Sequence, residues 1–84
     1  MKKHTRIYYK YFGYGIDDRI LCEYCNSKIA VDIHHIDNKG MGGSKEKDNI
    51  ENLIALCRVC HEDAHKEKIT KSELISIHFI KWSG

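Results

Sequence analysis

The chain has no proline, no internal repeat and no low-complexity tract, and none of its apolar runs is long enough to cross a membrane. Its first residues are basic and lead into a tyrosine-rich stretch, without the apolar core or small-residue cleavage site of a secretory signal. We therefore expect an intracellular protein that does not span a membrane. A length of 84 residues suits one small domain, and we expect residues 1–84 to form it.

The sequence also lacks a strong charge of either sign. Its formal net charge is only +2, and its lysine and arginine residues are spread along the chain as on an ordinary solvated surface. Charge alone is therefore weak support for a nucleic-acid partner, and any such partner has to be argued from a site.

Two cysteine pairs with C-x2-C spacing are the most informative feature that is present. A chain this short buries a modest core and usually needs a cross-link or a metal. Two disulfides would serve in a secreted protein, but the same pattern inside the cell favours zinc. We expect one closed structural Zn²⁺ site with four thiolate ligands, namely Cys22, Cys25, Cys57 and Cys60.

The remaining local patterns predict a small α+β fold. Residues 5–12 fit a short helix or a strand, and Gly13 and Gly15 end that element. Residues 29–34 are rich in β-branched side chains and predict a strand, and residues 53–56 predict the strand that returns. Residues 37–48 predict a mobile loop between them, and residues 57–68 a turn that runs into a helix.

A second helix is expected to begin after Thr70. Thr70 and Glu73 have the spacing of a capping box, with the threonine at the N-cap. Apolar residues follow at roughly helical spacing, with either His78 or Phe79 on the inner face.

Histidines form the second group of candidate ligands. His61 and His65 are four residues apart on the predicted helix and can share a metal, although such a pair is often only surface polarity. His61 could also replace Cys60 at the zinc, but four thiolates already complete that site. A third imidazole from His34 would give a three-histidine site with open positions for water and phosphate. The adjacent His35 could then be a general base, since imidazole titrates near neutrality.

Neighbours in a regular strand point to opposite faces, so His34 and His35 can flank one phosphate only if the strand bends or ends there. Asp32 shares a face with His34 and could orient a ligand, compete as a ligand, or, like Asp37, only face solvent. Asn52 could be a buried clamp on backbone groups across the hairpin or an ordinary turn residue.

The combined pattern resembles the HNH endonuclease family of the ββα-metal group. The resemblance covers about residues 22–66, which contain both cysteine pairs, the doublet His34-His35, Asn52, His61 and His65 in the family's order. It implies a treble-clef-like ββα-metal core with a four-cysteine structural zinc, followed here by a C-terminal helix. The spacing from Asn52 to His65 is also similar to that of the DNA-cleaving colicins, which lack the cysteine pairs.

The resemblance further implies roles for individual residues. His34, His61 and His65 correspond to ligands of one catalytic divalent metal, which could be Mg²⁺, Mn²⁺, Ni²⁺ or Zn²⁺. His35 corresponds to the general base, and Asn52 to the asparagine that holds the hairpin and orients this base. The implied activity is hydrolysis of DNA phosphodiester bonds, and the small size leads us to expect low sequence specificity.

Other functions remain open on the sequence alone. The chain could be a non-catalytic zinc module that binds nucleic acid or a protein partner, or a component of a phage packaging or restriction assembly. Small size and the absence of targeting signals suggest a bacterial or phage origin, and hence the cytoplasm of a bacterium or a phage-infected host. The five residues His34, His35, Asn52, His61 and His65 favour the enzyme, because a purely structural module needs none of them.

Overall fold

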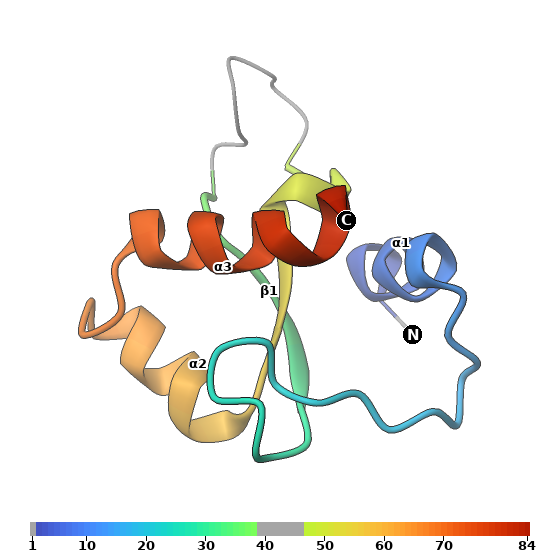
Figure 1. Cartoon of the computed structure of the whole chain (residues 1–84), viewed down its shortest axis with the longest axis horizontal. Coiled ribbons are helices and arrows are strands. Elements are labelled where there is room, and N and C mark those ends of the chain that lie inside the picture. Colours follow the sequence, from blue (N-terminus) through green and yellow to red (C-terminus); the bar gives the residue numbers. More distant parts are fainter. Residues whose placement is uncertain (1, 39–46) are drawn as a thin grey trace.

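The computed structural model describes residues 2–38 and 47–84, in which three helices surround a two-stranded antiparallel sheet (Figure 1). The elements are α1 (Lys3–Phe12), β1 (Asp32–His35), the 3-10 turn η1 (Ile50–Asn52), β2 (Leu53–Leu56), α2 (Arg58–His65) and α3 (Lys71–Ser83). The predicted α+β fold is therefore confirmed, with a ββα unit followed by a C-terminal helix. Most of the loop predicted at residues 37–48 lies outside the described residues.

The first strand differs from its prediction at both ends. We predicted residues 29–34, whereas β1 begins at Asp32 and includes His35, which pairs with Leu53 of β2. Ile29 instead forms an isolated bridge with Leu21, and the N–H of Cys22 donates to the carbonyl of Lys28 at 2.8 Å. The first residues of the predicted strand thus close the turn that carries the first cysteine pair.

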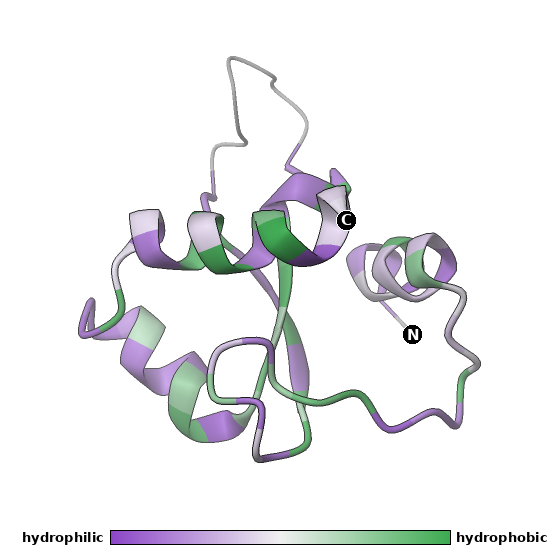
Figure 2. Ribbon diagram, in the orientation of Figure 1, coloured by the Kyte–Doolittle hydropathy of each residue, from purple (hydrophilic) through white to green (hydrophobic). Residues whose placement is uncertain are grey.

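The hairpin forms the middle layer of the molecule, because both faces of β2 are buried. Leu53 and Ala55 pack on one side in a cluster with Tyr8 of α1. Ile54 and Leu56 pack on the other side with three of the cysteines and Leu74 of α3. Figure 1 shows α1 and α2 on opposite sides of the strands, while α3 crosses them and its C-terminal end lies toward α1. In Figure 2 much of the hydrophobic colour lies on the strands, while α2 is largely hydrophilic.

The end of α1 and the start of α3 lie at residues that favour helix boundaries. Residues 5–12, left open between helix and strand, belong to α1, which stops at Gly13 with a left-handed φ of 72°. This conformation favours glycine and lets Tyr14 N–H reach back to the carbonyl of Tyr9 at 2.9 Å. The capping box at Thr70 and Glu73 is confirmed at the start of α3.

The inner face of α3 carries His78, which is fully buried, whereas Phe79 is 53% exposed. Of the two residues that the apolar spacing allowed on the inner face, His78 is therefore the buried one. Within the described residues, no helix is both long and apolar enough to cross a membrane.

Candidate functional site

The four cysteines lie together between the first turn and the start of α2. Their Sγ atoms are all within 4.8 Å of one another, and those of Cys25 and Cys57 are 3.9 Å apart. That distance is far too long for a disulfide but close to the roughly 3.8 Å expected between two thiolates on tetrahedral Zn²⁺. The cluster therefore has the arrangement of a structural zinc site, as predicted, and not that of two disulfides.

The surroundings of these thiols suit a bound cation. Burial raises the pKa of Cys22 and that of Cys60, because a thiolate there would be poorly solvated. Hydrogen bonds from Ser27 lower the pKa of Cys25 to about 6, so this residue favours the thiolate. A divalent cation would supply the charge that the buried thiolates need, and four sulfur ligands would leave no open position.

A second cluster brings together His34 of β1 with His61 and His65 of α2. One ring nitrogen of each lies within 4.8 Å of the others, and the Nε2 atoms of His61 and His65 are 3.1 Å apart. The ring centroids of His34 and His61 are 5.0 Å apart. Two neighbouring imidazoles on tetrahedral Zn²⁺ would place their nitrogens about 3.3 Å apart, so these side chains can share a divalent ion.

The electrostatics of this cluster favour neutral imidazole, the form that binds metals. Burial, followed by the neighbouring histidines, lowers the pKa of His34 to about 4. Asp32 lies on the same side, with Oδ2 3.8 Å from Nδ1 of His61. The carboxylate thus lies at the nitrogen of His61 that does not face His65, where it can help to orient that ring.

His35 points to the opposite side of β1, toward α1. Its Nε2 lies 2.7 Å from Oδ1 of Asp48, and its ring centroid is 4.4 Å from that of His4. The hydrogen bond from His35 lowers the pKa of Asp48, which is therefore a carboxylate near neutrality. Since a carboxylate can only accept, Nε2 of His35 donates in this hydrogen bond, and in the neutral imidazole Nδ1 has the lone pair.

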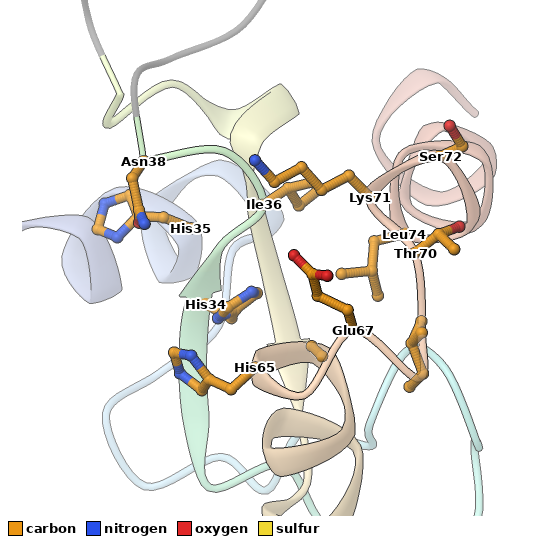
Figure 3. Close-up of a pocket in the computed structure, with 12 residues that line it drawn as sticks. His34, His35, Ile36, Asn38, His65, Glu67, Thr70, Lys71, Ser72 and Leu74 are labelled. Carbon is orange, nitrogen blue, oxygen red and sulfur yellow. The ribbon is translucent and has the colours of Figure 1, made fainter.

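The two neighbouring histidines nevertheless border one open cavity of about 590 Å³ (Figure 3). His34, His35 and His65 line one part of it, and Glu67 and Lys71 project into it from the other. The strand ends at His35, and although the two imidazoles point to opposite sides of β1, both residues lie at the edge of this cavity. The sequence did not establish this end, because the apolar pattern continues through Ile36.

Asn52, the last residue of η1, is completely buried directly before β2 and acts as a clamp on backbone groups. Its Oδ1 accepts a hydrogen bond from the N–H of Asp37, and its Nδ2 donates to the carbonyls of Asp37 and Lys47, all at 2.8 Å. These contacts hold the segment after β1 against the segment before η1, and so fix the hairpin beside His35.

A comparison with known protein families identifies the same motif in the chain. The family model of the HNH endonucleases matches residues 22–67, more than half of the chain. The chain belongs to the HNH endonuclease family. No curated protein and no solved structure matches it significantly.

Two features of this HNH protein were not found by sequence reasoning. His4 and Asp48 lie beside His35; His4 precedes the matched residues, Asp48 lies within them in the connection between the strands, and neither belongs to a recognisable pattern. The second is a buried network in which Glu23 contacts Tyr8 and His78, at 2.5 and 2.7 Å. An acidic residue inside a C-x2-C pair and a histidine within an apolar helical stripe were the available signals for this network.

Proposed function

We propose that this HNH domain, residues 1–84, is a metal-dependent endonuclease that hydrolyses DNA phosphodiester bonds with low sequence specificity. The observation that carries the proposal is the common cavity of His34, His35 and His65 at the end of β1. It offers metal-binding imidazoles and a separate imidazole with a free lone pair to the same bound group. Membership of the family supports a nuclease in general, and this cavity supports the specific assignment of roles.

His34, His61 and His65 would hold the catalytic divalent metal. Three ligands suit this role, because open coordination positions remain for a phosphate oxygen and water. When bound, the ion would polarise the phosphate and stabilise the departing 3′ oxygen. Asp32 would orient His61, and the low pKa of His34 would keep that ligand neutral across the physiological range.

His35 would act as the general base on the attacking water. The proton on its Nε2 is held by Asp48, so its Nδ1 is the nitrogen able to accept a proton. Asp48 would also stabilise the imidazolium that forms. Asn52 would contribute indirectly, by holding the backbone on either side of this pair.

Several cations near the site support a phosphate-bearing substrate, although Glu67 also lines the cavity and Lys71 lies 3.9 Å from Asp37. Lys71 projects into the cavity, and the nearby α1 carries the exposed cations Lys3, Arg6 and Lys10 and no acidic residue. Such side chains contact phosphates more than base edges, which is consistent with low sequence specificity.

Incubation of the zinc-loaded protein with supercoiled plasmid tests the proposal. Nicking is expected with added Mg²⁺, Mn²⁺ or Ni²⁺ and should be lost with EDTA. His35→Ala should reduce the rate by about 10²- to 10⁴-fold, the usual contribution of a general base, without changing the fold or zinc content.

Two results would count against this assignment. Absence of nicking with every metal, despite bound zinc and an intact fold, would favour a non-catalytic zinc module that binds nucleic acid or protein. Near wild-type nicking by His35→Ala, with loss in His34→Ala, would exchange the roles of base and ligand.

A further inference from the structure

A third group of possible ligands lies on the α1 side of β1, away from the three-histidine cluster. His4 of α1, His35 of β1 and Asp48 each offer one ligand atom within 4.8 Å of the others. The three come from separate parts of the chain, and all are partly buried. Side-chain exposure is only 19% for His35 and 14% for Asp48, so the group is not a chance meeting of solvated side chains.

The donor set selects a particular kind of ion. Two imidazoles and one carboxylate suit Zn²⁺, Co²⁺, Ni²⁺ or Cu²⁺, whereas Mg²⁺ prefers oxygen ligands and retains its water. The environment of Asp48 is already favourable to a cation, since Nζ of Lys3 lies 3.9 Å from its Oδ2. That lysine is 68% exposed and can move into solvent when a metal binds.

We propose that His4, His35 and Asp48 form a second transition-metal site, and that its occupation inactivates His35 as a base. The metal would take the place of the proton between His35 and Asp48. Neutral imidazole has one proton and one lone pair, so a metal on Nε2 places the proton on Nδ1. His35 would then have no lone pair for water. The inhibitory part rests on the proposed nuclease function, whereas the binding part does not.

Binding at this site should be weaker than at His34, His61 and His65. An incoming ion has to break the hydrogen bond of 2.7 Å between His35 and Asp48 and compete with Lys3. At the three-histidine cluster an ion would replace the 3.1 Å contact between the Nε2 atoms of His61 and His65, which involves no carboxylate, and Asp32 lies at the other nitrogen of His61. Cleavage should therefore rise at low transition-metal concentration and fall at high concentration.

Cobalt binding to the zinc-loaded protein tests the site directly, by calorimetry and by the visible absorption of Co²⁺. Wild type should bind two further ions in distinguishable steps. His4→Gln should lose the weaker step, and the matched variant His61→Gln should lose the tighter one. Asp48→Asn removes another ligand of the same site and should also lose the weaker step. Circular dichroism checks that each variant is folded. A single further ion in wild type, or two in folded His4→Gln and Asp48→Asn, would overturn the site.

Plasmid nicking tests the consequence. In wild type, the rate at saturating Co²⁺ should be about a hundredfold or more below the rate at the optimal Co²⁺ concentration, because loss of a general base costs that much. In His4→Gln these two rates should be nearly equal. Two-step binding without any cleavage would contradict the nuclease and leave the site standing. Two-step binding with unchanged cleavage at excess Co²⁺ would overturn the inhibition.

Discussion

Asn52 forms hydrogen bonds with both the backbone N–H and the backbone carbonyl of Asp37, each 2.8 Å long. A third bond, also of 2.8 Å, runs to the carbonyl of Lys47. One buried side chain thus joins the two ends of the connection between the strands. His35 and Asp48 lie at those same ends, so the geometry of the proposed base depends on this amide.

Asn52→Ala should therefore destabilise the fold and slow cleavage. Three backbone groups lose their partner, and each buried unpaired group costs about 1–3 kcal/mol, partly relieved by water. We expect a loss on the order of 3 kcal/mol in urea unfolding at fixed zinc concentration. The exposed Asn38 provides the control, because Asn38→Ala should change stability by less than about 0.5 kcal/mol. Equal stability of the two variants would show that the Asn52 amide does not hold the hairpin.

The sequence revealed those parts of the site that depend on local spacing. The cysteine pairs, His61 with His65 and the capping box at Thr70 each lie within one or two helical turns or a tight turn, where chain geometry fixes their relation. Pairing of His35 with His4 and Asp48 depends instead on how α1 and the connection between the strands dock on the sheet. Hydrophobic periodicity states which face of an element is buried but not which element covers it, so these partners could not be predicted.

Loss of one thiolate should unfold the domain. The core around Leu56 and Leu74 includes the cysteines themselves, so zinc and core are one unit. In small domains the free energy of zinc binding is free energy of folding. Cys57→Ser and Cys60→Ser should lose both zinc and helical circular dichroism, whereas metal analysis of wild type should find one tightly held zinc per chain. Wild type without zinc, or with intermolecular disulfides, would contradict the site.

The buried pair Glu23 and His78 should contribute strongly to stability. Both ring nitrogens of His78 lie within hydrogen-bond distance of oxygen atoms, Oε1 of Glu23 at 2.7 Å and the carbonyl of Ile50 at 2.6 Å. His78→Leu would remove this partner from the buried Glu23 side chain and the Ile50 carbonyl, at a cost of about 1–3 kcal/mol for each group left unpaired.

A double-mutant cycle isolates this interaction. The variant with both Glu23→Gln and His78→Leu should be less destabilised than the sum of the single changes. Glu62→Gln, at the exposed pair with Arg58, serves as a surface control and should alter stability by less than about 0.5 kcal/mol. Strict additivity at Glu23 and His78 would show that the pair is not coupled.

The last prediction concerns the unequal contributions of His61 and His65 to the catalytic metal. His61 is partly buried and faces Asp32 through its other nitrogen, whereas His65 is exposed, so water can partly replace His65 but not His61. His61→Ala should abolish nicking more completely than His65→Ala. Calorimetry on the zinc-loaded protein should show the tighter divalent-ion step in wild type and its loss in His61→Ala.

The affinity of that step should rise with pH, because protons compete with the metal for the histidine ligands. His34, with a pKa of about 4, is already mostly neutral at pH 5 and should contribute little to this rise. Equal binding by wild type and His61→Ala would remove His61 from the site and favour a zinc-stabilised binding module over a nuclease.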